Sequence, residues 1–138
     1  MSVKQIQINT FPPITNIQRE ITKTNCVVTE MLNRFPSEKN TNTLEYALEV
    51  LDGYCYVPVK LTLWIGRYVR YLNMSDSFDM KLKLGGFVVN DNGYTVTLKT
   101  NKNLFEFAYI RVSKRNCIWF MVMIDDDIKR IQMNSLIK

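Results

Sequence analysis

The strongest local signal in the chain is the stretch of residues 87–99, FVVNDNGYTVTLK. β-Branched and aromatic residues on both sides of NDNG favour extended chain, and asparagine and glycine readily adopt the positive φ angles of a tight turn. Two such runs joined by such a turn predict a β-hairpin. A lone hairpin is barely stable in water, so we expect the chain to build an antiparallel sheet around this segment.

Further strands are expected on both sides of this hairpin. Residues 78–84 (FDMKLKL) alternate, which predicts a strand with Phe78, Met80, Leu82 and Leu84 on one face. Residues 54–72 are typical of extended chain, with an edge or a break at Pro58 because proline cannot donate a ladder hydrogen bond. Residues 104–112 and 117–124 predict a second hairpin across SKRN. The latter run is apolar on both faces and should be a central strand.

Helices are expected near both ends of the chain. Apolar residues recur at three- and four-residue steps up to Arg34, which predicts an amphipathic helix capped by Thr15 or Asn16 and closed by Pro36. This stripe comprises Ile17, Ile21, Val28, Met31, Leu32 and Phe35. Residues 37–43 (SEKNTNT) predict a loop, and residues 44–53 favour a short helix by a small margin. Acidic residues 125–127 suit a helix start, which predicts a short C-terminal helix after them.

Together these elements predict an α+β fold. We expect a single domain over residues 1–138, in which an antiparallel β-meander sheet is flanked by the N-terminal amphipathic helix and the short C-terminal helix. The 138 residues, 46% of them hydrophobic, suffice for a core without disulfides or metals. No apolar run approaches the roughly 20 residues needed to cross a bilayer, and no secretory signal is present. We therefore expect an intracellular protein.

The composition excludes several kinds of active site. The sequence has no histidine and three widely spaced cysteines, Cys26, Cys55 and Cys117, which we expect to be reduced core thiols. Histidine-based catalysis and Cys/His zinc sites are therefore excluded, and no phosphate-binding glycine loop is present. Residues 125–127, or Glu45, Glu49 and Asp52, could bind magnesium beside a lysine, but a helix cap and a solvated helix face explain every one of these residues without any chemistry. We predict no enzymatic activity, no metal and no cofactor.

Residues 60–72 carry the main functional hypothesis. Read as one strand, they place Lys60, Trp64, Tyr68 and Arg70 on one side, with Gly66 between the rings. Aromatic rings stack on bases and cations contact phosphates in proteins that bind single strands. Neighbouring strands could add Lys81, Lys83, Lys99, Lys102, Lys114 and Arg115. With a net charge of +5, the sequence predicts a non-enzymatic protein that binds single-stranded DNA or RNA.

An alternative reading needs no ligand. Tyrosine and tryptophan are favoured in any strand, and Trp64 could instead lie under the N-terminal helix. Seven methionines would also serve an oligomer interface, as in a structural or accessory protein that acts through self-association or protein–protein contacts. The abundance of Asn, Ile, Lys and Thr is typical of an AT-rich coding genome, which suggests a viral protein and then a location in the host cytoplasm or nucleus. Exposure of Trp64 and Tyr68 distinguishes the two readings.

Overall fold

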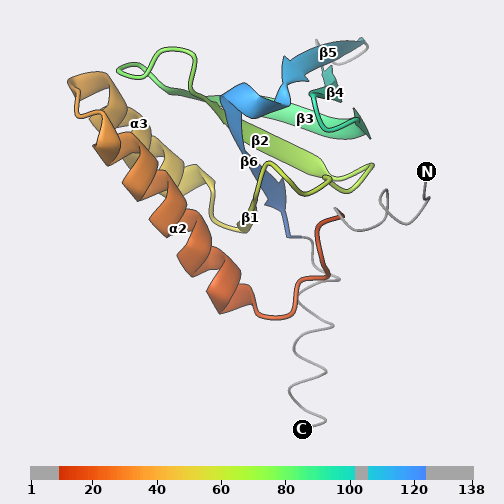
Figure 1. Cartoon of the computed structure of the whole chain (residues 1–138), viewed down its shortest axis with the longest axis horizontal. Helices are drawn as coiled ribbons and strands as arrows, with labels where there is room; N and C mark the ends of the chain where they lie inside the picture. The colour runs from red at the N-terminus through yellow and green to blue at the C-terminus, as the bar shows by residue number, and fades with distance from the viewer. Residues whose placement is uncertain (1–9, 102–105, 124–138) are drawn as a thin grey trace, which may run out of the picture.

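The computed structural model describes residues 10–101 and 106–123 and has an α+β fold (Figure 1). Two helices pack against a six-stranded antiparallel sheet with the order β1-β6-β2-β3-β4-β5. The elements are α2 (Ile17–Arg34), α3 (Glu38–Val50), β1 (Tyr54–Val57), β2 (Tyr68–Asn73), β3 (Lys81–Asp91), β4 (Thr95–Asn101), β5 (Phe107–Ser113), the 3-10 helix η1 (Lys114–Asn116) and β6 (Cys117–Val122). The C-terminal helix expected after residues 125–127 lies outside the described residues. Among those described, no helix is long and apolar enough to cross a membrane.

The hairpin predicted from NDNG is confirmed, whereas the second predicted hairpin is wrong. β3 pairs with β4, and Gly93 adopts a φ of +90° in the turn between them. β5 pairs with β4 rather than with β6, so β2 to β5 form a meander. η1 then redirects the chain, and β6 returns between β1 and β2. A strand that is apolar on both faces needs neighbours on both sides, and the predicted central position of β6 is confirmed.

The single strand expected over residues 60–72 does not exist. β1 ends at Val57, and β2 begins only at Tyr68. Pro58 starts a turn closed by the Leu61 N–H to the Pro58 carbonyl (2.9 Å), and Gly66 takes a φ of +85°. These two breaks convert most of the predicted strand into a connecting loop over residues 58–67.

Residues 37–43, predicted as a loop, begin helix α3 instead. Ser37 caps α3 by accepting the Asn40 N–H at 3.0 Å. The Asn40 side chain is buried and donates to the carbonyls of Phe35 and Ser77 at 2.7 and 2.8 Å. It also accepts the Met80 N–H at 2.9 Å. Polar residues here build the junction between α3 and the start of β3, which explains why composition alone indicated a loop.

β3 begins later than the alternation over residues 78–84 predicted. It begins at Lys81, and Phe78 lies exposed in the preceding turn. Met80 and Leu82 pack into the core, but Leu84 is exposed because the register with β2 shifts beside it. The predicted apolar face is therefore correct at its centre and wrong at both ends.

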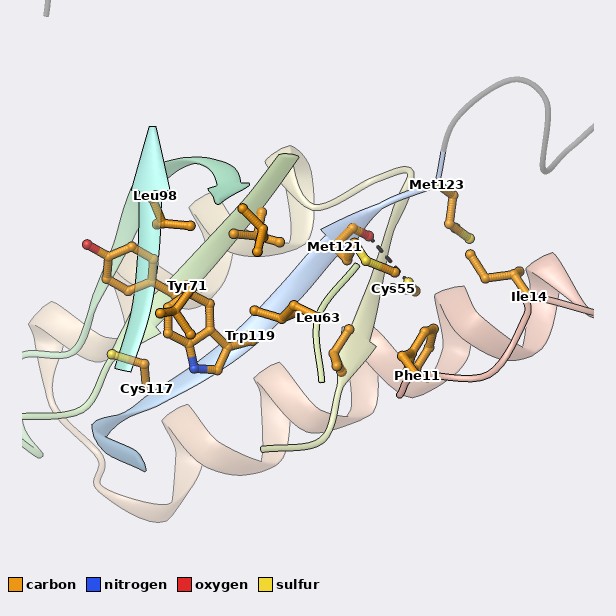
Figure 2. Packing of buried hydrophobic residues seen from close by; sticks show 14 residues of the cluster. Phe11, Ile14, Cys55, Leu63, Tyr71, Leu98, Cys117, Trp119, Met121 and Met123 are labelled. Atoms are coloured by element: carbon orange, nitrogen blue, oxygen red, sulfur yellow. Dashed lines mark hydrogen bonds between the residues drawn. The ribbon is translucent and has the colours of Figure 1, made fainter. Parts of the chain in front are cut away.

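Two apolar clusters hold the layers together. The first joins α2 and α3 to the sheet through Val28, Leu32, Ala47, Leu72 and Phe120. The second covers the opposite face of the sheet, where residues 11–14 and the loop over residues 58–67 pack on the strands (Figure 2). It contains Phe11, Ile14, Cys55, Leu63, Tyr71, Val88, Val96, Leu98, Cys117, Trp119 and Met121. Each sheet face thus carries its own apolar cover, and the helices supply only one of them.

The three cysteines, all of them in the described part of the chain, form no disulfide and have different environments. Cys55 and Cys117 are buried in the second cluster, as predicted, and the Cys55 thiol lies 3.3 Å from the Met121 carbonyl oxygen (Figure 2). Cys26 is exposed on α2, so the core position predicted for it is wrong. It lies on the helix surface between the buried positions Thr24 and Val28.

The two edges of the sheet differ. Along β1, the Tyr56 N–H donates to the Thr24 hydroxyl of α2 at 3.0 Å, and that hydroxyl lies 3.2 Å from the Tyr54 carbonyl oxygen. α2 therefore caps the β1 edge with a buried side chain. At the other edge, β5 pairs with β4 and with no other strand of the described residues.

Candidate nucleic-acid interface

The sequence predicts Trp64 on the same side of the sheet as Tyr68 and Arg70, but the structure places it on the opposite side. Its indole N–H donates to the Phe11 carbonyl at 2.8 Å, and the two rings lie 5.8 Å apart. The Arg67 guanidinium sits 4.7 Å from the Trp64 ring centroid, and Trp64 packs against the second apolar cluster. Trp64 is thus a half-buried part of the core cover, and it shares no stripe with Tyr68 and Arg70.

Lys114 is buried and supports the fold. Its ammonium lies 2.6 Å from Asp91 Oδ2 and donates to the Leu61 carbonyl at 2.7 Å. The two charged side chains are 2% and 0% exposed, so Lys114 cannot contact a ligand at the surface. Asp91 also accepts the Leu63 N–H at 3.0 Å, which ties the β3–β4 turn to the loop over residues 58–67.

The other predicted cations are dispersed. Lys60 is exposed in the loop over residues 58–67, and Arg115 is exposed on η1. Lys81 lies 3.9 Å from Asp79 in a surface ion pair, and Lys83 is exposed two residues further along β3. Lys102 lies outside the described residues. The four described side chains form no continuous stripe.

Tyr68 and Arg70 do lie together, on the helix side of β2. Arg70 is buried, with Nε 3.3 Å from the Lys83 carbonyl oxygen and Nη2 3.3 Å from the Tyr46 hydroxyl of α3. The Tyr68 hydroxyl donates to the Leu84 carbonyl at 2.6 Å. Burial raises the pKa of the neighbouring Tyr54, an effect that the Arg70 charge opposes. Arg70 therefore fixes the junction of α3 with the sheet, and Tyr68 begins a different surface.

That surface continues across four strands in register. Tyr68 lies opposite Phe87, Phe87 opposite Lys99, and Lys99 opposite Tyr109. Residues directly opposite in antiparallel strands project from the same face about 5 Å apart. The Tyr68 and Phe87 rings meet edge to face with centroids 5.1 Å apart. A row of three rings and one ammonium thus crosses β2, β3, β4 and β5.

Flanking residues widen this row along the strands. Phe107 lies two residues from Tyr109, and the Lys99 ammonium sits 4.2 Å from the centre of its ring. Arg111 lies on the other side, where it lines a polar hollow of about 330 Å³ together with Asn90, Asn92, Thr95 and Thr97. We call the whole surface the aromatic face; it comprises Tyr68, Phe87, Lys99, Phe107, Tyr109 and Arg111.

The aromatic face is open. Phe87, Phe107 and Tyr109 are 47%, 60% and 65% exposed. α2 packs on β1 and α3 packs near the start of β3, and β4 and β5 extend away from both helices (Figure 1). An isolated exposed ring is ordinary, but neighbouring rings on one face form an apolar patch of the kind that marks a contact surface.

Sequence reasoning named two members of this face, Tyr68 and Lys99, and missed the rest. Three of the four missed residues lie on β5, where Phe107, Tyr109 and Arg111 alternate with Ala108, Ile110 and Val112. That alternation is visible in the sequence and predicts a one-sided strand. The sequence analysis paired β5 with β6 instead of β4. It therefore did not show that the outward residues of β5 continue the row that passes through Lys99.

Searches against protein-family models, curated proteins and solved structures find no match to the chain. Within residues 10–101 and 106–123, no group of three or more cysteine or acidic side chains is placed to hold a metal ion. Glu45, Glu49 and Asp52 therefore gather no such site, and residues 125–127 lie outside this region. The aromatic face is the strongest candidate site that the described residues offer.

Proposed function

We propose that this protein is a non-enzymatic binder of single-stranded nucleic acid, and that the aromatic face is its binding surface. The observation that carries the proposal is the register row Tyr68–Phe87–Lys99–Tyr109, which sets exposed rings beside a cation on an open sheet. Rings of this kind stack on unpaired bases, and each stacked base is worth about 1–3 kcal/mol. Single strands fit better than duplexes because their bases are free to stack.

Two cations of the aromatic face can contact the phosphate backbone of a single strand. Lys99 lies within the row, and Arg111 lies two residues from Tyr109 on β5. Each phosphate neutralised on a single strand changes the slope of log affinity against log salt by about 0.7. Two cations give a modest salt dependence, so we expect stacking to supply most of the affinity.

The test is an anisotropy titration with fluorescently labelled single-stranded DNA and RNA of mixed sequence. Tyr109→Ala should weaken binding by about 1–3 kcal/mol without lowering the melting temperature, because the ring is mostly exposed. Tyr94→Ala is the matched control, since Tyr94 is an exposed tyrosine at the β3–β4 turn, away from the row. Lys99→Ala should reduce the salt slope by about 0.7. No affinity in the parent protein, or equal losses for Tyr109→Ala and Tyr94→Ala, would refute the proposal.

A second candidate function is self-association, and the contrast between the sheet edges favours it. α2 caps the β1 edge through Thr24, whereas the outer edge of β5 pairs with none of the described strands. An uncapped edge strand can pair with the same strand of a second copy and so continue the sheet. Sedimentation equilibrium over a wide dilution series tests this: a dimer supports it, and a monomer at every concentration rules it out.

A further inference from the structure

A hollow of about 420 Å³ opens beside the aromatic face, between β3 and β4. This volume lies within the range of about 300–1,000 Å³ that is usual for small-molecule sites. Two rings of the aromatic face and two lysines line the hollow. Two polar residues of β4 also line it, together with one ring and one aliphatic side chain from the core side. The lining residues are Tyr68, Tyr71, Lys83, Leu84, Gly85, Phe87, Lys99, Thr100, Asn101 and Ile110.

The hollow is built by the backbone of β3. The β3–β4 ladder ends at the pair Phe87–Lys99, whereas the β4–β5 ladder continues to Asn101–Phe107. The β2–β3 register shifts at Gly85, which adopts a φ of +75°. A Cβ at Gly85 would collide with the Val69 carbonyl, so only glycine allows this bulge. The first half of β3 thus follows β2 and leaves a slot against the end of β4.

The groups around this slot match the parts of a nucleotide. Tyr68 and Phe87 present rings, and the hydrogen bond from Tyr68 to the Leu84 carbonyl fixes the first ring in the wall. Thr100 and Asn101 can each donate and accept hydrogen bonds, as recognition of a base edge requires. Lys83 and Lys99 place positive charge at the slot, as a phosphate requires.

We infer that this hollow binds a single unstacked nucleotide, with the base against Tyr68 and Phe87 and the phosphate at Lys83. The inference rests on the proposed function and adds to it one position at which the identity of the base matters. Stacking on the aromatic face tolerates every base, because every base has a π-face. A slot whose polar groups pair with a base edge disfavours the bases that leave those groups unpaired.

Isothermal titration calorimetry with the four ribonucleoside 5′-monophosphates, ribose 5-phosphate and inorganic phosphate tests the inference. At least one mononucleotide should bind at a single site, about tenfold or more tighter than ribose 5-phosphate. Lys83→Ala should weaken that binding about fivefold or more. Lys81→Ala is the matched control because Lys81 is an exposed lysine of β3 that does not line the hollow, and it should leave the affinity unchanged.

Two results overturn the inference. If ribose 5-phosphate or inorganic phosphate binds as well as every mononucleotide, the site recognises phosphate alone. If Lys83→Ala and Lys81→Ala have equal effects, the binding does not involve the hollow. The anisotropy titration separates this inference from the proposed function. If oligonucleotides bind and mononucleotides do not, the inference about the hollow is refuted and the proposed role of the aromatic face stands. If mononucleotides bind and oligonucleotides do not, the inference about the hollow is supported and the proposed role of the aromatic face is refuted.

Discussion

Replacing Lys114 with methionine should destabilise the fold severely. The change removes the ammonium that lies 2.6 Å from Asp91 and 2.7 Å from the Leu61 carbonyl, and it leaves a carboxylate in a site where its side chain is 0% exposed. Removing one partner of a buried ion pair typically costs about 3–5 kcal/mol, because the remaining charge stays desolvated. The Leu63 and Gly93 N–H groups still donate to Asp91, which favours the lower end of this range. Urea unfolding followed by tryptophan fluorescence measures the loss.

Two further variants make this measurement decisive. Arg115→Met is the matched control, since Arg115 is the exposed neighbour of Lys114 on η1 and should change stability by less than about 0.5 kcal/mol. Adding Asp91→Asn to Lys114→Met should recover part of the loss, because it removes the unpaired charge. A loss below about 1 kcal/mol for Lys114→Met would refute the reasoning. Reduced oligonucleotide affinity in a stable Lys114→Met variant would restore Lys114 as a binding residue.

Four further outcomes follow from particular positions. Gly85→Ala should cost several times as much stability as Gly93→Ala, because both have positive φ but only at Gly85 would a Cβ collide with backbone; thermal melts compare them. Trp64→Ala should cost roughly 3 kcal/mol in urea unfolding and leave oligonucleotide affinity unchanged. In the native protein a thiol reagent should label Cys26 alone, and labelling of two or three thiols would contradict the burial of the others. Burial raises the pKa of Cys117 from 9.0 to about 11, so the stability it contributes is complete below about pH 9 and is lost as the pH rises toward 11. Cys117→Ala should therefore show a smaller alkaline loss than the parent in urea unfolding measured at several pH values.

The features that the sequence predicts correctly depend on residues that are close together in the chain. The hairpin β3–β4 is fixed by its own turn, where Gly93 and Asn92 supply the geometry. The central position of β6 follows from its composition, because a strand without a polar face cannot border water. In contrast, the start of α3 depends on Asn40, whose partners Ser77 and Met80 lie 37 and 40 residues further along the chain. No local pattern could reveal that a polar heptapeptide would be paired in this way.

The candidate site was only partly predictable for the same reason. Parity along residues 60–72 grouped Lys60, Trp64, Tyr68 and Arg70, but it holds only within an unbroken strand, and Gly66 ends that continuity. Rows across a sheet are set by register between strands, and register here includes shifts beside Arg70 and Val89. Each shift changes which residues share a face. Membership of the aromatic face therefore became clear only once all three ladders were known.

The sheet can expose this face because its other side is anchored. Val88, Val96 and Leu98 are almost fully buried in the second apolar cluster, so β3 and β4 are held from the side opposite the rings. The Lys114–Asp91 pair fixes the β3–β4 turn to the loop over residues 58–67, which covers this cluster. The strands at the β5 end therefore need no helix over them. Exposing their aromatic side chains to water is unfavourable, and a ligand that covers the rings would remove this unfavourable contact. If the aromatic face binds single strands as proposed, its strands are held in place before the ligand arrives, which reduces the entropy lost on binding.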